Sequence, residues 1–374
     1  MNQQDREPAA NLKVLDLFSG SGGMSTGFHR NGNFQIVGAV DFEKAKPSQG
    51  PGATSCNQTY LKNIGLAPLF ADLSVIEPKA VAEHFDIDGD SLDVLISCAP
   101  CTGFSQKQSS NHSNDDARNF LVERTGEFVE FFQPKFLVME NVKELAKGRH
   151  KHHLQNLVNH LDRIGYSTTF EVHNLADFGL PQNRIRTLLI AKRGGRPPKI
   201  HFAESARQSV RDAIGHLATV AADGSIDPMH ICPTTTKHVL ERMQAIPRDG
   251  GSWIDIPQSK KHLLIPSMDL DDPGSYPDIY GRLSWDKAAP TITRECSSPG
   301  NGRYTHPELD RLLTVREMAL IQGFPNDYHF VGNLSSKYRQ IGDAVPPFIS
   351  SMIAQLIVEN ADSKVKAVSY GLFD

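Results

Sequence analysis

The sequence has little of what would assign it to several specialised protein classes. Five cysteines in 374 residues form an odd, widely spaced set, which excludes a disulfide-stapled secreted scaffold and favours an intracellular chain. No apolar run reaches the roughly 18 residues that a membrane-spanning helix needs. The polar N-terminus lacks the apolar centre of a signal peptide. The net charge of −4 means that any nucleic-acid-binding face has to be local.

The composition is that of a globular protein, with 39% hydrophobic and 22% charged residues. The length fits one large domain with a smaller one. Short apolar segments typical of buried strands alternate with longer segments typical of helices. Strands are predicted at 14–18, 35–40, 92–97, 136–139 and 187–191, and helices at 22–30, 115–132 and 151–164. This alternation predicts an α/β fold whose parallel sheet has helices on both faces and binds ligands at the carboxyl ends of its strands.

The pattern changes at about residue 193. Residues 193–303 are rich in glycine and proline turns and show little periodicity, which indicates a separate, irregular module. Helical patterns return at 312–321 and 348–358. We therefore expect residues 1–192 to form the sheet domain, residues 193–303 a smaller domain, and residues 304–374 a segment that returns to complete the first.

A glycine-rich turn follows the first predicted strand. Residues 19–23 (SGSGG) lead into a predicted helix. The start of a helix favours a negative group, and the glycines, which lack side chains, let a ligand approach the backbone. Asp41 closes the next strand, where a carboxylate can bind ribose hydroxyls, and Asp72 follows a third apolar segment. Ser25 stands where a nicotinamide fingerprint needs its third small residue, which weakens that reading. The pattern predicts a site for an adenosine-bearing ligand, with a plain tight turn as the alternative.

Two cysteines lie three residues apart after the strand at 92–97. Cys98 and Cys101 could form a redox pair, although that motif normally belongs to a much smaller fold. A zinc site would need a second pair of ligands at matching spacing, and the sequence has none. The third reading is a single nucleophile, Cys101, held after Pro100 at the end of the strand and followed by a polar loop. Spacing alone leaves the three readings open.

Six motifs, taken in order, resemble those of the cytosine-5 DNA methyltransferase family of bacterial or phage type. They are DLFSGSGG at 16–23, PCTGFS at 100–105, MENV at 139–142, QNRIR at 182–186, RLLTVRE at 311–317 and QIGDAVP at 340–346. The resemblance implies a Rossmann-like, S-adenosylmethionine-dependent sheet domain with a target-recognition domain at 193–303. It also implies transfer of a methyl group to carbon 5 of a flipped-out cytosine in a specific duplex DNA sequence, giving 5-methylcytosine.

The resemblance assigns the catalytic roles to four residues. Cys101 would add to carbon 6 of cytosine, because a thiolate makes carbon 5 nucleophilic enough to accept a methyl group. Glu140 would supply a proton or hydrogen bond at ring nitrogen 3. Arg184 and Arg186, two apart in an extended segment, would hold the base's carbonyl oxygen and Glu140.

The same resemblance implies the binding residues. The cofactor-binding set is Phe18, Gly20, Gly22, Gly23, Asp41, Phe42, Asp72, Pro100, Asp343 and Ala344. The DNA-binding set is Ser105, Arg118 and Thr291. Further candidates for DNA contact in the recognition region are Arg248, Trp253, Lys260, Lys261, Arg282 and Trp285, although most of these six are expected to be solvated charges or core aromatics. Three positions depart from the family pattern: Asp41 replaces the more usual glutamate, Asp343 an asparagine and Leu320 a frequent arginine.

Histidines at 150, 152 and 153 could suggest a metal. Because no acidic or cysteine partner lies at ligand spacing, we expect a solvated helix start there and no metal in the protein. The expected partner is double-stranded DNA, with a cognate restriction endonuclease acting separately and no membrane. We expect a monomer in the cytoplasm, associated with the nucleoid.

Three other functions have to be weighed. A sibling enzyme that acts on transfer RNA typically carries a Cys-Phe-Thr signature, but Pro233 follows Cys232 and Ser297 follows Cys296. A non-catalytic DNA-binding regulator on the same scaffold would tend to lose the nucleophile, which Cys101 retains. A nicotinamide oxidoreductase is the most distant alternative.

Overall fold

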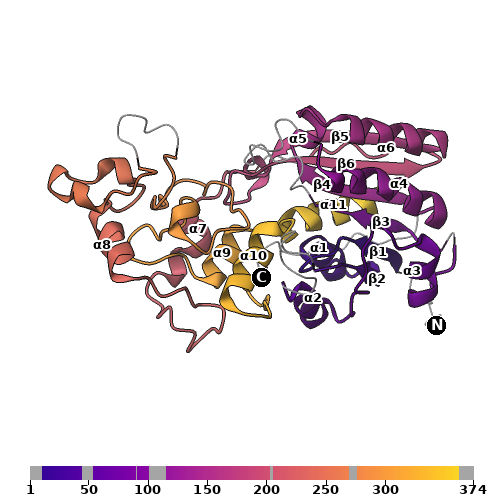
Figure 1. The fold of residues 1–374 in the computed structure, drawn as a ribbon. Helices are drawn as coiled ribbons and strands as arrows, with labels where there is room; N and C mark the ends of the chain where they lie inside the picture. Colours follow the sequence, from indigo (N-terminus) through magenta and orange to yellow (C-terminus); the bar gives the residue numbers. More distant parts are fainter. Residues whose placement is uncertain are drawn as a thin grey trace, which may run out of the picture.

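The computed structural model describes residues 11–43, 54–89, 91–100, 115–202, 205–268 and 276–361. The described chain forms two lobes, a sheet lobe with helices on both faces and a second lobe built mainly of loops and short helices (Figure 1). The two lobes lie side by side along the long axis of the molecule (Figure 1).

A six-stranded sheet in the order β2-β1-β3-β4-β6-β5 organises the sheet lobe. Its strands are β1 (Leu12–Leu17), β2 (Phe34–Val40), β3 (Val94–Ser97), β4 (Phe136–Val142), β5 (Tyr166–Asn174) and β6 (Ile185–Arg193). β1 to β4 pair in parallel, as the sequence predicts, whereas β6 runs antiparallel to both β4 and β5. The expected all-parallel sheet is therefore mixed. The apolar segment before Asp72 forms only an isolated parallel bridge between Leu69 and Val40.

Eleven α-helices are present in the described residues. They are α1 (Gly23–Arg30), α2 (Cys56–Ile64), α3 (Pro78–Phe85), α4 (Phe120–Phe132), α5 (Glu144–Lys147), α6 (His152–Arg163), α7 (Val210–Ile214), α8 (Lys237–Ala245), α9 (Val315–Ile321), α10 (Leu334–Asp343) and α11 (Pro347–Asn360). Short 3-10 turns join them: η2 (Ala117–Asn119), η3 (Leu175–Phe178), η4 (Gly215–Leu217), η5 (Trp253–Asp255), η6 (Gln258–Leu263) and η7 (Pro299–Asn301).

The alternation of side chains along β1 divides the core of the sheet lobe into two layers. Leu15 and Leu17 pack with α3, α4 and α6 on one face of the sheet. Val14 packs with α1 and α11 on the other face. The sheet is therefore buried on both faces, which explains why its central strands read as continuous apolar runs in the sequence.

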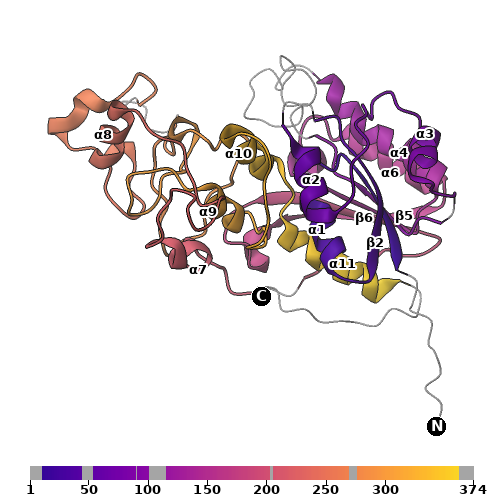
Figure 2. The ribbon, with the colours of Figure 1, turned by 90° about the horizontal axis from the view of Figure 1, so that it is seen from below.

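Helices α1 and α11 approach so closely that their contact requires glycine. A Cβ on Gly23 would lie 2.2 Å from the carbonyl oxygen of Val345, and one on Gly27 would lie 2.2 Å from the backbone nitrogen of Ser351. Gly23 and Gly27 are four residues apart and so lie on one face of α1. The last described helix is thereby held against the first, as Figure 2 shows.

Residues 334–360 are long and apolar enough, by composition alone, to cross a membrane, but 72% of the most apolar window is buried inside the structure. The stretch also consists of two helices, α10 and α11, which meet at Pro346. Apolar side chains of α11 pack in the core of the sheet lobe and those of α10 in the core of the second lobe, as expected of helices in a protein core.

The second lobe has its own apolar core, in which α7, α9 and α10 pack around Trp285. Trp253 centres a smaller cluster beside it. Arg282 is fully buried and donates to the carbonyl oxygens of Ile246 and Leu309. Burial excludes these three side chains from the candidates for DNA contact. It confirms the expected alternative for Trp253 and Trp285, which are core aromatics, whereas Arg282 is neither a DNA contact nor a solvated charge.

Buried polar contacts join the two lobes. The side chain of Gln182 donates to Gln322 Oε1 over 2.7 Å and accepts from the backbone nitrogen of Ile292 over 3.0 Å. Gln322 in turn donates to the carbonyl oxygen of Ala344 over 2.8 Å. All of these groups are buried, so each contact that was lost would leave an unsatisfied polar atom.

The contact between α1 and α11 can be tested with one methyl group. Gly27→Ala should lower the free energy of unfolding by about 1–3 kcal/mol, because the added Cβ meets backbone atoms that cannot move aside cheaply. Gly89→Ala is the matched control, since no atom lies within 4 Å of its added Cβ. Urea denaturation measures both, and identical unfolding curves for the two variants would contradict the close approach.

Candidate active site

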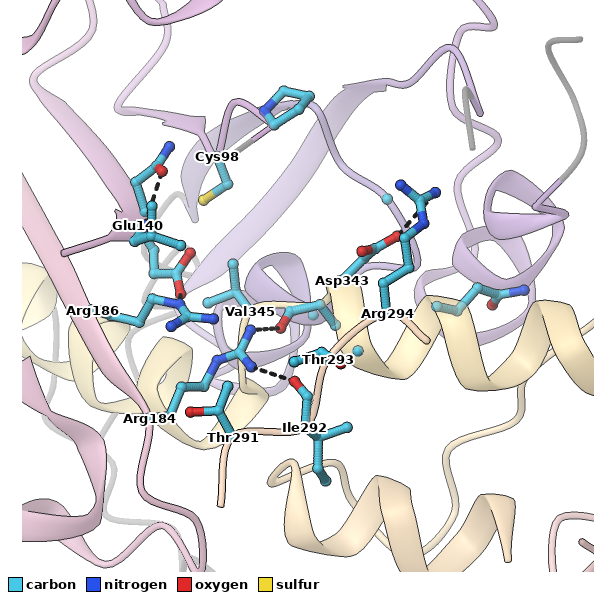
Figure 3. Close-up of a pocket in the computed structure, with 18 of the residues that line it drawn as sticks. Cys98, Glu140, Arg184, Arg186, Thr291, Ile292, Thr293, Arg294, Asp343 and Val345 are labelled. Carbon is cyan, nitrogen blue, oxygen red and sulfur yellow. Dashed lines mark hydrogen bonds and ion pairs between the residues drawn. The ribbon is translucent and has the colours of Figure 1, made fainter. Parts of the chain in front are cut away.

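A cavity of about 1450 Å³ lies between the two lobes. The carboxyl ends of β1, β2, β3 and β4 form one wall, and residues 290–294 and 300–304 of the second lobe form the other. Single drug-sized ligands occupy sites of roughly 300–1,000 Å³. This cavity therefore has room for two ligands side by side. Figure 3 shows part of it.

Asp16, in β1, is the most strongly perturbed acid of the cavity wall. It is 1% exposed, and its Oδ2 accepts from Ser25 Oγ over 2.6 Å. Ser25 also contacts the hydroxyl of Tyr60 over 2.7 Å. Asp16 Oδ1 is buried without a hydrogen-bond partner among the described residues. Burial raises the pKa of Asp16 to about 7.

The turn after β1 is fixed by the acid that ends β2. Gly20 has a φ of +52°, and nothing lies within 4 Å of the position where a Cβ would stand. Its backbone nitrogen donates to Asp41 Oδ2 over 2.9 Å, and the backbone nitrogen of Glu43 donates to Asp41 Oδ1 over 2.6 Å. Asp41 therefore shapes both loops that border this part of the cavity.

Most other residues of the expected cofactor set border the same region. Phe18 follows β1, and Phe42 packs against Phe70 with ring centroids 5.4 Å apart. Asp72 Oδ1 accepts from the backbone nitrogen of Ser74 over 2.9 Å. Pro100, Gly23 and Ala344 also line the cavity. Gly22 does not, and its missing side chain faces Tyr328 and Tyr60 instead.

The end of β3 leads toward the predicted nucleophile. Cys101 and Ser105 lie outside the described residues, which end there at Pro100. Cys98 borders the cavity, and burial together with the charge of Glu140 raises the pKa of its thiol. The side chain of Asn141 donates to the carbonyl oxygen of Ala99 over 3.0 Å, so β4 fixes the backbone just before Cys101.

Glu140 and Arg186 meet in the cavity. Arg186 Nε lies 2.8 Å from Glu140 Oε1, and both side chains are largely buried. Pairing of β4 with β6 brings them together, since Glu140 lies opposite Leu188 and Arg186 opposite Val142. Figure 3 shows the pair facing the sulfur of Cys98.

Arg184 has different neighbours from Arg186. Its guanidinium donates to the carbonyl oxygens of Ile292 over 3.0 Å and Ala344 over 3.2 Å, and it is 3% exposed. Figure 3 shows it between the segment at 291–293 and the end of α10. Thr291 Oγ1 donates to the carbonyl oxygen of Asn183 over 2.6 Å, at the cavity edge.

Two of the departures from the family pattern have structural partners. Asp343, in place of asparagine, lies 3.3 Å from Arg294 Nη2 and faces it across the cavity wall (Figure 3). Leu320 packs on the core of the second lobe, where an apolar residue suits its surroundings. Arg118, at the cavity edge, pairs with Asp116 through two contacts of 2.6 and 2.8 Å.

The expectation that the histidines of residues 150–153 have no acidic partner is wrong. Asp115 lies within 3.5 Å of His150, His152 and His153, and only His152 is substantially exposed. A search for ligands at short spacing along the sequence could not find this contact, because Asp115 precedes the histidines by more than 30 residues.

Sequence reasoning also overlooked three residues of the cavity wall. Asp16 was read as part of a strand, Asn141 had no assigned role, and Glu43, whose Oε1 accepts from the backbone nitrogen of Asn57 over 2.6 Å, was not considered. The sequence signal that could have found them is a polar residue at or just after the carboxyl end of a buried strand, where ligands bind in such sheets. Asp16, Asn141 and Glu43 all have this position.

The family model for C-5 cytosine-specific DNA methylases matches residues 12–359. The chain belongs to this family. It is 33% identical over 355 residues to the Type II methylase M.HgiDII of Herpetosiphon aurantiacus. This alignment covers 92% of this chain and 94% of the relative. It is 32% identical to the Type II methyltransferase M1.HphI of Haemophilus parahaemolyticus, over 93% and 87% of the two chains. This DNA methylase therefore methylates carbon 5 of cytosine in DNA, with S-adenosylmethionine as the methyl donor.

Solved structures agree on the fold of this DNA methylase. A DNA modification methyltransferase encoded within an Escherichia coli prophage superposes with a TM-score of 0.69 at 22% identity, over 94% of this chain and 99% of that one. The Entamoeba histolytica methyltransferase EhMeth gives a TM-score of 0.63 at 15% identity, over 95% and 100% of the two chains.

The perturbed carboxyl of the methylase predicts a pH-dependent stability. Asp16 keeps its proton to about pH 7 in the folded chain, but loses it near its ordinary pKa of 3.8 in the unfolded chain. The folded state therefore loses stability as the pH rises from about 4 to 7. Asp16→Asn should be more stable than the unchanged protein at pH 8, by up to about 4 kcal/mol, with no difference at pH 4.

Thermal or urea unfolding of the ligand-free protein across this pH range measures the difference. Asp72→Asn, at the same cavity, controls for a general effect of removing negative charge. A difference in the free energy of unfolding between Asp16→Asn and the unchanged protein that did not vary with pH would refute the raised pKa of Asp16.

Proposed function

We propose that this methylase acts on a cytosine flipped out of duplex DNA, through a covalent adduct with Cys101, and recognises a specific sequence. The observation that supports this best is the contact of Glu140 with Arg186, one strand away from the segment that leads into Cys101. A base within a duplex cannot reach a cavity enclosed by two lobes, so the cytosine has to leave the stack.

In the proposed reaction, the thiolate of Cys101 adds to carbon 6 of cytosine while Glu140 holds a proton at nitrogen 3. Arg186 fixes one oxygen of Glu140 and orients that carboxyl toward the base. S-adenosylmethionine supplies an electrophilic methyl group on its sulfonium. Carbon 5 would take this methyl group as the sulfur–methyl bond breaks, with S-adenosylhomocysteine as the leaving group. A base then takes the carbon-5 proton and the thiolate leaves, which regenerates the aromatic ring and the free cysteine.

Arg184 has a positioning role in this proposal. Its guanidinium donates to backbone carbonyls in the second lobe and at the end of α10, and these hydrogen bonds fix the two walls of the cavity relative to each other. We propose that Arg186 alone of the two arginines contacts the base or its partner Glu140. Thr291, Arg118 and Ser105 would contact DNA at the cavity mouth.

The sheet side of the cavity fits S-adenosylmethionine. Asp16 Oδ1 is a buried acceptor that lacks a donor, which the ammonium of the methionine part would supply. The open space at Gly20 admits a ligand against the backbone. Asp41 would hold the ribose, Phe18 and Phe42 the adenine, and Asp72 its exocyclic amine. Pro100, Asp343, Ala344 and the glycines at 22 and 23 complete the proposed set.

The proposed organisation assigns catalysis to residues 1–192, target recognition to residues 193–303 and closure of the sheet domain to residues 304–374. Within this last segment α11 covers the sheet, whereas α9 and α10 pack in the second lobe. We further propose a monomer that needs no metal in its catalytic cavity and acts in the cytoplasm on nucleoid DNA, away from membranes. The Type II names of its relatives favour a cognate restriction endonuclease that acts separately.

A methyl-transfer assay tests the proposal. Duplex genomic DNA should accept label from S-adenosylmethionine, and transfer RNA should not. A duplex with 5-fluorocytosine at the target should trap the enzyme, because fluorine cannot leave as the carbon-5 proton does. Cys101→Ser should neither transfer label nor form this adduct. Label transfer by that variant at an undiminished rate would exclude the covalent route.

Glu140→Gln should lower kcat by about 10²–10⁴-fold, because the amide keeps the size and the contact with Arg186 but cannot deliver a proton to nitrogen 3. Binding of S-adenosylmethionine should change little, as judged by the ligand-induced rise in Tm. Glu171→Gln, an exposed change on β5, is the control and should retain full activity. Equal kcat values for the two variants would remove Glu140 from the chemistry.

A further inference from the structure

Asp115 and a group of histidines form a second polar cluster, outside the cavity. Asp115 precedes η2 and α4, whereas His152 and His153 begin α6. His152 Nε2 lies 3.2 Å and His153 Nε2 lies 3.0 Å from the same oxygen, Asp115 Oδ2. His150 Nδ1 lies 3.5 Å from Asp115 Oδ1. None of these residues lines the cavity between the lobes.

The spacing of these atoms is that of ligands around one ion. Zinc binds imidazole nitrogen and carboxylate oxygen at about 2.0–2.2 Å, so two ligands at a tetrahedral angle lie about 3.3–3.5 Å apart. The separations of Asp115 from the histidine nitrogens, 3.0–3.5 Å, are close to this value. One ligand atom each from Asp115, His152 and His153 lies within 4.8 Å of the others. Small side-chain rotations would close the remaining gap.

A second carboxylate orients the buried histidine. His153 Nδ1 lies 2.5 Å from Glu123 Oε1, on α4, while its Nε2 points at Asp115. The side chain of His153 is 9% exposed, so this orientation is fixed by packing. A carboxylate on the far nitrogen of an imidazole is the usual outer partner of a metal-binding histidine, because it sets the tautomer and raises the basicity of the ligating nitrogen.

The two carboxylates on His153 also suit a bound cation. A neutral imidazole donates from one nitrogen only, so His153 can donate to Glu123 from Nδ1 and present the lone pair of Nε2 on the side of Asp115. A metal ion shared by Nε2 and Asp115 would accept that lone pair, whereas without the ion a protonated His153 donates to both carboxylates.

We propose that Asp115, His152 and His153 bind a divalent transition-metal ion of the zinc type. Two imidazoles and one carboxylate suit zinc, nickel or copper better than magnesium or calcium, which prefer oxygen ligands. Asp115 and His152 are exposed, so an ion can enter from solvent. The bound ion would cross-link the chain before α4 to the start of α6 and stabilise the packing of these two helices.

Zinc titration of the whole protein, after treatment with a chelator that is then removed, tests this proposal. Calorimetry should give one tight site per chain, and zinc should raise Tm. His152→Ala should weaken binding at least tenfold without unfolding the protein, because that side chain is more than half exposed. Asp115→Asn should have the same effect. Glu123→Gln should weaken binding about 10–100-fold while leaving all direct ligands in place.

His160→Ala is the matched control. His160 lies on the same helix and also pairs with a carboxylate, Glu130, over 2.9 Å, but among the described residues it belongs to no cluster of three metal-binding side chains. This variant should bind zinc as the unchanged protein does. With Co²⁺ as a probe, a visible absorption band from tetrahedral coordination should appear in the control and vanish in His152→Ala. Zinc binding that is absent, or that His152→Ala and His160→Ala change equally, would overturn the proposal.

Discussion

The docking of the two lobes depends on the buried guanidinium of Arg184. It reaches the carbonyl oxygens of Ile292 and Ala344, which lie more than 100 residues away along the chain. Because these acceptors are buried, no water can replace the donor, and removing it would leave unsatisfied groups at a cost of about 1–3 kcal/mol each. The cavity exists only while the lobes stay docked. In the proposed roles, Arg184 therefore helps to set the geometry in which Arg186, two residues later, contacts Glu140.

The cavity wall divides the two proposed tasks between neighbouring strands. The ends of β1 and β2 carry Asp16, Gly20 and Asp41, which surround the proposed donor site. The ends of β3 and β4 carry Pro100 and Glu140, which border the proposed base site. Parallel strands bring all of these termini to one edge of the sheet, so donor and acceptor would meet at the boundary between β1 and β3, which are hydrogen-bonded neighbours.

Much of the sheet lobe could be predicted from the sequence, because its parallel strands are apolar on both faces and bounded by glycine or polar residues. β5 could not, since its exposed edge position gives a mixed polar pattern with no clear period. Motif order predicted catalytic roles for Glu140, Arg184 and Arg186, and the structure places Glu140 and Arg186 in contact. The motif gave no sign that Arg184 and Arg186 have different neighbours, because both lie in one short segment. Burial of Arg282 could not be predicted, and DNA contact by Trp253 could not be excluded, because composition does not reveal which side chains an irregular lobe buries. Contacts between distant segments, such as Asp115 with His153, leave no local signal.

The glycine contact between α1 and α11 also bears on biosynthesis. One layer of the sheet needs α11 to cover it, yet the ribosome makes that helix only after the entire second lobe. A nascent chain therefore carries an uncovered apolar sheet face until its last described helix emerges. The methylase would become competent to modify DNA only after α11 has been made, and a truncated product that lacked α11 would expose this face to chaperones or proteases.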